Sequence, residues 1–271
     1  MDLSPALIAE LLALGVVAGF LAGLLGVGGG MMMVPVLTLV FTQRGVEGGV
    51  AVKMAIATSM ATIMFTSLSS LRAHHGLGNV KWPIARAMAP GIVAGSLAAG
   101  AGAFAVLKGQ TLALVFAAFI GYMALQLLRG RQPRPSRQLP GWAGLAGMGA
   151  LIGFLSALVG AGGAFLSVPF MTWCNVPPRH AVGTSAALGF PIALASTAGY
   201  VVAGWGLAPA LPGAVGYLYL PALAIVSLAS VSLAPLGASA AQRMDVAMLK
   251  RLFALLLLAL AASMLHRAFR A

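Results

Sequence analysis

The chain is short of charge, and above all of acidic residues. Only 7% of its 271 residues are charged, and Asp and Glu together number 4. A soluble domain has roughly 25% charged residues, so a soluble fold could not cover its surface with so few. The carboxylates of Asp2, Glu10, Glu47 and Asp245 all lie near the ends of apolar segments. This distribution leaves no acid pair for general acid–base chemistry, so we do not expect an enzyme. It also leaves no intramembrane acid for proton coupling.

Cysteine is scarcer still, and potential metal ligands form no cluster. Cys174 is the single cysteine, which excludes an internal disulfide. His74 and His75 are adjacent, but no carboxylate or cysteine cluster lies near them in the sequence. The three methionines at 31–33 are more typical of adaptable packing than of a soft-metal site. We therefore expect no metal and no other cofactor.

Hydrophobic residues make up 61% of the chain, well above the roughly 45–50% of an average soluble domain. A spanning helix needs about 20 apolar residues. We predict an all-α polytopic membrane protein with about eight full spans and two half-helices, because two of the apolar segments are too short to span. The apolar segments lie at roughly 5–27, 30–42, 50–71, 82–106, 110–128, 141–161, 163–174, 180–204, 213–240 and 249–266.

Matching glycine interruptions occur in two places. Residues 19–35 read GFLAGLLGVGGGMMMVP, and residues 153–169 read GFLSALVGAGGAFLSVP. An interior glycine costs a helix about 1 kcal/mol relative to alanine. We therefore predict a helix that stops near Val27 and restarts near Met31, with a second break of the same kind. Open backbone at membrane depth is tolerated where protein buries it or water reaches it, so the breaks are predicted to line a cavity.

A second pair of matches follows the breaks. Residues 55–59 (AIATS) correspond to residues 181–185 (AVGTS), and a basic residue stands two positions before each, Lys53 and Arg179. Two separated matches in the same order indicate an internal duplication, and glycine interruptions at corresponding positions point to a transporter binding site. We divide the chain into a first transmembrane repeat at 1–128, a basic cytoplasmic linker at 129–140 and a second transmembrane repeat at 141–271.

Basic charge predicts how the repeats are oriented. If each repeat makes five passes, the repeats are inverted, both termini lie outside, and the positive-inside rule is satisfied better than with parallel repeats. The five basic residues then left on the far side are Arg44, Lys53, Lys108, Arg267 and Arg270. The cytoplasmic side holds Arg72, Lys81, Arg86, Arg129, Arg131, Arg134, Arg137, Arg179, Arg243, Lys250 and Arg251.

The net charge of +12 is explained by cytoplasmic loops that meet anionic lipid. It does not predict nucleic-acid binding, because no basic face alternates with stacking aromatics. The glycine run at 26–30 follows an apolar helix and not a strand, which excludes a dinucleotide fingerprint. The expected partners are the lipid bilayer and a small anion. The oligomeric state stays open, with a homodimer as one option.

The breaks are typical of an anion site. A helix that begins at such a break directs unpaired N–H groups and a positive dipole end into the interior, and two facing ends could hold a small oxyanion. The alternative is that the glycines allow close helix crossing, as the spacing of Gly15, Gly19 and Gly23 also does. The predicted substrate-binding residues are Gly28, Gly29, Gly30, Met31, Thr58, Ser59, Gly162, Gly163, Ala164, Thr184 and Ser185.

Two of these assignments have competing explanations. The hydroxyls of Thr58, Ser59, Thr184 and Ser185 could donate to an oxyanion or bond back to their own helix. Lys53 and Arg179 could guide anions toward opposite mouths or anchor the protein to lipid headgroups.

These motifs resemble the TauE/SafE family of sulfite and organosulfonate exporters, within the toluene-sulfonate uptake permease superfamily. The resemblance is carried by residues 19–37, 57–59, 153–171 and 181–187. Ala57 replaces the glycine usual before Thr-Ser, and Ala164 replaces the third glycine of the second break. The resemblance implies a bacterial inner-membrane carrier for small sulfur-containing anions such as sulfite, thiosulfate or sulfoacetate.

Export is the direction that the sequence favours. One charge crossing 100 mV is worth about 2.3 kcal/mol, so a negative cytoplasm drives an anion outward without a coupling ion, and no intramembrane carboxylate is available for coupling. An anion channel, or an importer of thiosulfate or sulfite coupled to an ion, remains the alternative.

Overall fold

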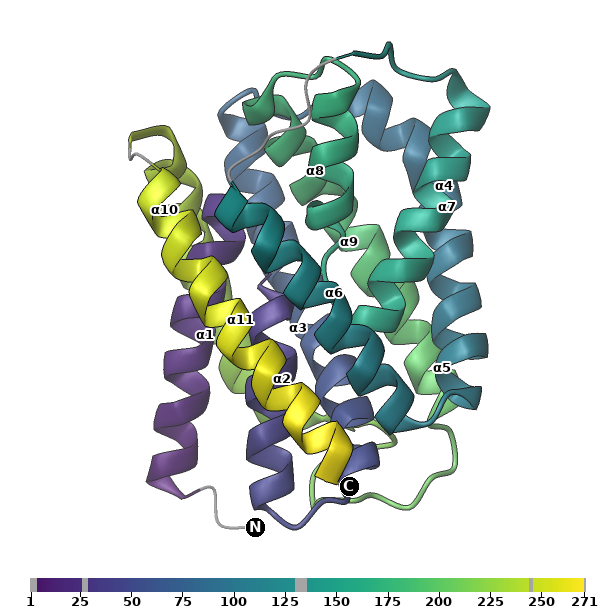
Figure 1. The fold of residues 1–271 in the computed structure, drawn as a ribbon, viewed down its shortest axis with the longest axis vertical. Coiled ribbons are helices and arrows are strands. Elements are labelled where there is room, and N and C mark those ends of the chain that lie inside the picture. The colour runs from purple at the N-terminus through teal and green to yellow at the C-terminus, as the bar shows by residue number, and fades with distance from the viewer. Residues whose placement is uncertain (1–3, 26–28, 130–135, 244–245, 271) are drawn as a thin grey trace.

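The computed structural model describes residues 4–25, 29–129, 136–243 and 246–270, which form a bundle of helices aligned roughly with its long axis (Figure 1). The first part of the chain contains α1 (Pro5–Leu25), α2 (Gly30–Gln43), α3 (Gly48–Gly76), α4 (Trp82–Leu97), a π-helical segment (Ala98–Ala103), α5 (Phe104–Val106) and α6 (Gly109–Arg129). The second part contains α7 (Trp142–Val159), α8 (Ala164–Trp173), α9 (Pro178–Ala203), β1 (Ala214–Val215), β2 (Leu218–Tyr219), α10 (Leu220–Arg243) and α11 (Val246–Arg270).

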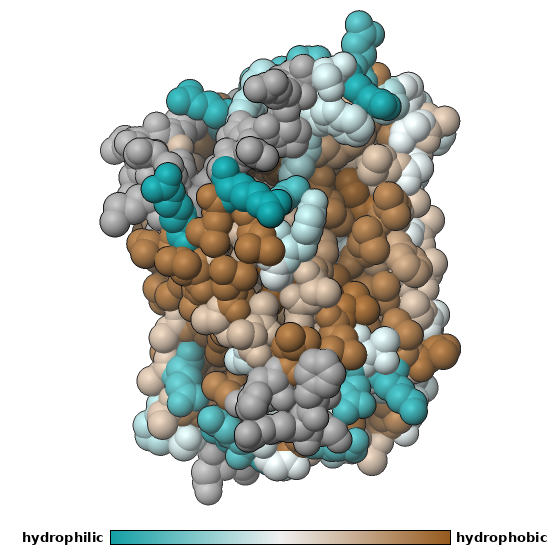
Figure 2. All heavy atoms as spheres, in the orientation of Figure 1, coloured by the Kyte–Doolittle hydropathy of each residue, from teal (hydrophilic) through white to brown (hydrophobic). Residues whose placement is uncertain are grey.

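The predicted helical membrane architecture is confirmed. Among the described residues, seven helices are long and apolar enough to cross a membrane, so the predicted count of eight is not confirmed. Shorter apolar helices occupy Gly30–Gln43, Ala164–Trp173 and Arg251–Leu265. Figure 2 shows a hydrophobic band around the middle of the visible face, with hydrophilic side chains gathered at the two ends.

The two ends of the bundle differ in their loops (Figure 1). Helix α1 begins and helix α11 ends at one end, which we call the termini end; it also holds residues 44–47, 107–108 and 204–219. The opposite end, the linker end, holds residues 77–81, 136–141 and 174–177. Of the basic residues predicted for the cytoplasm, those within the described ranges belong to the loops and helix ends at the linker end. Arg131 and Arg134 lie outside the described residues.

Glycines allow helices from the two parts of the chain to pack closely. Helix α1 packs along α10, and helix α4 packs along α7. A Cβ atom on Gly15 would lie 2.7 Å from the Cβ of Ala229, and one on Gly153 would lie 2.8 Å from Ser96 Oγ. Each contact joins a helix of the first part to a helix of the second. The predicted small-residue face on α1 is confirmed, because no larger side chain fits there.

Candidate functional site

The second helix break has the predicted form. Helix α7 ends at Val159, and Gly160 follows in the left-handed conformation with φ 70°. Helix α8 begins at Ala164, directly after Gly163 with φ 76° and ψ −12°. Glycine adopts this region without the steric cost that other L-residues incur, which explains why the chain unwinds at these residues.

The first break repeats this geometry at its restart. Gly29 has φ 74° and ψ −6°, and α2 begins at Gly30, one residue before the predicted restart at Met31. The preceding helix α1 ends at Leu25. Gly28, another predicted binding residue, lies outside the described residues.

The two breaks touch inside the bundle. Helix α2 runs from its break to the termini end, whereas α8 runs from its break to the linker end (Figure 1). A Cβ atom on Gly30 would overlap the carbonyl oxygen of Gly160 and lie 3.4 Å from the Cα of Ala161. A Cβ atom on Gly160 would lie 2.9 Å from Val34 Cγ2. The start of α2 therefore lies against the second break, and helices α2 and α8 run from the breaks toward opposite ends of the bundle.

The start of each short helix leaves main-chain donors available. The N–H groups of Leu166 and Ser167 donate to the Gly163 carbonyl over 3.1 and 2.9 Å, and those of Met32 and Met33 donate to the Gly29 carbonyl. The amides before them, such as those of Ala164 and Phe165, belong to the first turn, which has no intrahelical acceptors. Each helix start also carries roughly +0.5 of an elementary charge. Each break therefore carries one partial positive charge, at the start of its short helix.

The two threonines have a structural role that the sequence did not reveal. Thr58 Oγ1 accepts a hydrogen bond of 3.0 Å from the Tyr219 N–H, just before α10. Thr184 Oγ1 accepts one of 2.9 Å from the Lys81 N–H, just before α4. Both threonines are fully buried. Each therefore fixes the start of a helix in the opposite part of the chain, while its own proton remains available to an acceptor.

The serines beside these threonines differ in their partners. Ser185 Oγ lies 2.8 Å from Ser167 Oγ on α8, so it reaches the helix that starts at the second break. Ser59 Oγ is buried and has no hydrogen-bond partner in the described part of the chain. It lies on the face of α3 that carries Ile56 and Ile63, since residues three and four apart share a helix face. Both isoleucines flank the breaks.

Ser156 is a further residue at the breaks, and sequence reasoning missed it. Its Oγ would lie 3.2 Å from a Cβ on Gly163 and has no partner among the described residues. Buried hydroxyls are normally hydrogen-bonded, so an unpaired one beside bare amides is notable. The signal was available: the second copy has Ser156 where the first has Ala22.

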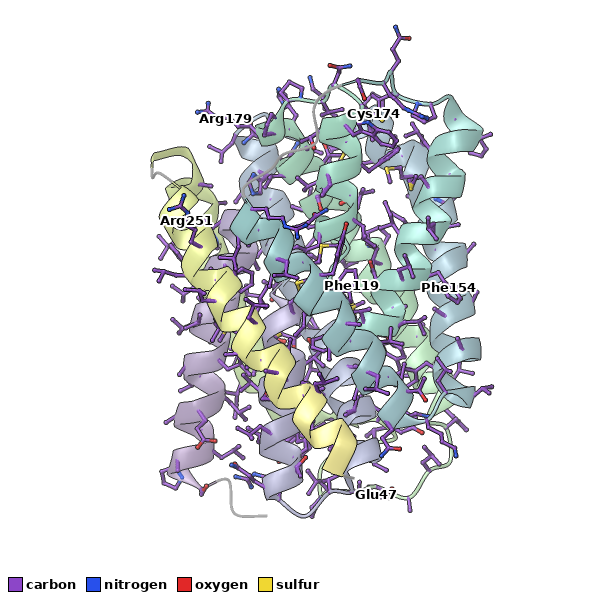
Figure 3. The ribbon with its side chains drawn as sticks, in the orientation of Figure 1. Glu47, Phe119, Phe154, Cys174, Arg179 and Arg251 are labelled. Atoms are coloured by element: carbon purple, nitrogen blue, oxygen red, sulfur yellow. The ribbon has the colours of Figure 1, made fainter. Side chains whose placement is uncertain are left out.

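The two basic residues lie toward opposite ends of the bundle. Lys53 stands near the start of α3 at the termini end and is 8% exposed. Arg179, at the start of α9, is exposed at the linker end, and Figure 3 shows it and Glu47 at opposite ends of the bundle. That these ends are the mouths of a pathway, and that the two residues guide anions, stay predictions.

Two pockets can be described, and both are at the termini end. One, of about 310 Å³, lies among residues 201–216, and the other, of about 380 Å³, surrounds Lys53. Neither includes a residue of the two breaks, so the predicted cavity there stays a prediction. No group of three metal-ligating side chains occurs within the described ranges.

Comparison with known proteins decides the family. A family model described as "Sulfite exporter TauE/SafE" matches residues 11–264. The chain belongs to the TauE/SafE family. A "probable membrane transporter protein" of Haemophilus influenzae is 34% identical over 256 residues, which cover 93% of this chain and 96% of the relative.

More distant relatives of this TauE/SafE protein are also described as probable membrane transporter proteins. One from Methanocaldococcus jannaschii is 25% identical over 87% of this chain and 86% of its own length. One from Bacillus subtilis is 29% identical over 75% of this chain and 83% of its own length. No solved structure matches the chain. This TauE/SafE protein is therefore a multi-pass membrane transporter.

Proposed function

We propose that this protein carries a small sulfur-containing oxyanion or sulfonate, such as sulfite or sulfoacetate, across the bacterial inner membrane. The observation that supports this most is the contact between the two breaks, where Gly30 at the start of α2 meets Gly160 at the end of α7, four residues before α8 begins. The family description names sulfite export, and a helix start is a ready-made anion site.

The binding chemistry suits a carrier. Two helix starts of roughly +0.5 each offset most of the charge of a monoanion without any charged side chain at the breaks. The unpaired hydroxyls of Ser59 and Ser156 add donors that fit oxyanion oxygens. Because no full ion pair must be broken, the anion can also leave, which transport requires.

The proposal includes inverted repeats. Helix α1 packs along α10, just as α7 packs along α4. Thr58 accepts a hydrogen bond from the Tyr219 N–H, just as Thr184 accepts one from the Lys81 N–H. Helices α2 and α8 diverge toward opposite ends of the bundle (Figure 1). An exchange of equivalent contacts in opposite directions is what a two-fold axis in the membrane plane would produce.

We further propose export, with the linker end in the cytoplasm. The positive-inside rule favours that orientation, because the linker end carries more basic residues. The membrane potential then supplies about 2.3 kcal/mol per charge per 100 mV, which is enough to drive an anion outward.

Flux of labelled sulfite in proteoliposomes tests this function. We expect uptake that saturates, that follows an imposed potassium-diffusion potential and that is unchanged by a proton gradient. Absence of sulfite and sulfoacetate flux in folded protein would contradict the proposed substrate class. Flux that persists at zero potential and follows the proton gradient would contradict uncoupled export, and single-channel currents would contradict a carrier.

A further inference from the structure

Lys53 is a buried cation that has no carboxylate partner among the residues that the structure describes. It is 8% exposed, and its Nζ lies 3.4 Å from the carbonyl oxygen of Ala105. The same atom lies 5.4 Å from the ring centroid of Phe104 and 5.5 Å from that of Tyr217. These are its contacts within the described residues. Buried charges in proteins are normally paired with an opposite charge, and none of these contacts within the described residues supplies one.

A pocket opens beside this ammonium. Its volume is about 380 Å³, and its wall includes Lys53, Lys108, Tyr217 and the first turn of α3 at 48–50. Helix α6 also begins in this wall, at Gly109. The starts of α3 and α6 add partial positive charge to that of the two lysines. The wall is therefore strongly biased toward an anion.

Glu47 is the one carboxylate in the described wall. Its side chain is exposed, so water screens its charge far more than it screens the charge of Lys53. Figure 3 shows Glu47 at the rim of the bundle, at the termini end. It weakens the positive field of the pocket without neutralising the buried ammonium.

We propose that this pocket is a second anion site, at the mouth of the pathway, which binds a small oxyanion against Lys53 before or after it occupies the breaks. This inference rests on the proposed transport function. Lys53 lies about 7 Å along α3 from the first residue of the helix, at 1.5 Å per residue. Ser59 lies farther along the same helix. One helix therefore links the mouth site to the central site.

The two repeats differ at the position of this site. Arg179 occupies the position equivalent to Lys53 in the second repeat, but it is exposed, and no pocket that can be described surrounds it. Phe104 and Tyr217, which cover Lys53, thus create a site on the termini side for which the linker side has no described counterpart. Arg179 is consequently a natural control.

Equilibrium binding of labelled sulfite to the full-length protein in detergent tests the proposal. We expect two sulfite ions per chain for the unmodified protein and for Arg179→Met, and one for Lys53→Met, which keeps the apolar stem and removes the charge. Lys53→Arg should keep two. Equal stoichiometry and affinity for Lys53→Met and the unmodified protein would overturn the mouth site.

Two exposed positions keep the test decisive if Lys53→Met fails to fold. Glu47→Gln should tighten the mouth site and Lys108→Met should weaken it, each by about threefold, a typical change for a screened surface charge. Unchanged affinity in both would overturn the proposal. The mouth site and the site at the breaks can be disproved separately. If the unmodified chain binds one sulfite ion and Lys53→Met binds none, the result supports the mouth site and contradicts the site at the breaks.

Discussion

Thr58 accepts a hydrogen bond from the backbone N–H of Tyr219, although 161 residues separate them. The bond joins the middle of α3 to the residue before α10, and it is wholly buried. Thr184 repeats it with Lys81 before α4. Two threonines that were predicted from the sequence to bind substrate therefore join the two parts of the chain.

Removing one of these hydroxyls should destabilise the fold. Thr58→Val removes the Oγ1 that accepts the buried hydrogen bond from the Tyr219 N–H, and the loss of a buried hydrogen bond of this kind costs about 1–3 kcal/mol. Thermal unfolding in detergent should show a lower midpoint for Thr58→Val and a nearly unchanged one for Thr58→Ser, which keeps the acceptor. Equal midpoints for the two variants would contradict this role.

The close packing of α1 on α10 gives a second prediction. At Gly23 a Cβ atom would overlap the carbonyl oxygen of Ala234, whereas at Gly147 it would meet nothing within 4 Å. Gly23→Ala should therefore lose about 1–3 kcal/mol by overpacking, and Gly147→Ala should be neutral or slightly stabilising. Folded yield and unfolding midpoint measure both. A stable Gly23→Ala protein would show that the helices separate at little cost.

The unpaired serines should separate stability from transport. Ser156→Ala and Ser59→Ala each remove a buried hydroxyl that has no partner in the described chain, so the unfolding midpoint should stay level or rise. If these hydroxyls bind the anion, half-saturation for sulfite should rise by about tenfold, the effect of one lost hydrogen bond to a charged group. Ser263→Ala, on an exposed hydroxyl that bonds its own helix, is the control. Wild-type half-saturation in both variants would remove these serines from the site.

Strain at the second break gives a fourth prediction. Gly163 has φ 76°, and a Cβ there would overlap Ile192 Cδ1. Gly163→Leu should abolish sulfite flux, because it blocks the space in front of the α8 amides. Protein recovered from the membrane and its helix content by circular dichroism are measured in parallel. Normal flux from Gly163→Leu would mean that the anion binds elsewhere.

The sequence predicted the breaks well because their cause is local. Glycine preference and apolar length act within a few residues, and the predicted half-helix at 163–174 is observed at Ala164–Trp173. The segment predicted at 213–240 instead begins as helix at Leu220. Residues 214–219 form a short hairpin that reaches Thr58, and such a distant contact leaves no periodic signal.

The burial of a side chain by residues from distant parts of the chain could not be predicted from the sequence either. Lys53 and Arg179 occupy matching positions, yet one is buried and the other exposed. The difference arises from Phe104 and Tyr217, which lie over Lys53 from distant parts of the chain. Ser156 was missed for a related reason. What makes it notable is that its hydroxyl has no hydrogen-bond partner among the described residues, and this depends on the tertiary structure.

The pairing of helices between the two parts of the chain has a consequence for either part made alone. Neither α1 nor α4 has its close partner in the first part, because α10 and α7 both come from the second. The first part alone would therefore leave two glycine-lined faces uncovered. In the proposed inverted-repeat arrangement, a second copy of that part in the opposite orientation would cover both faces.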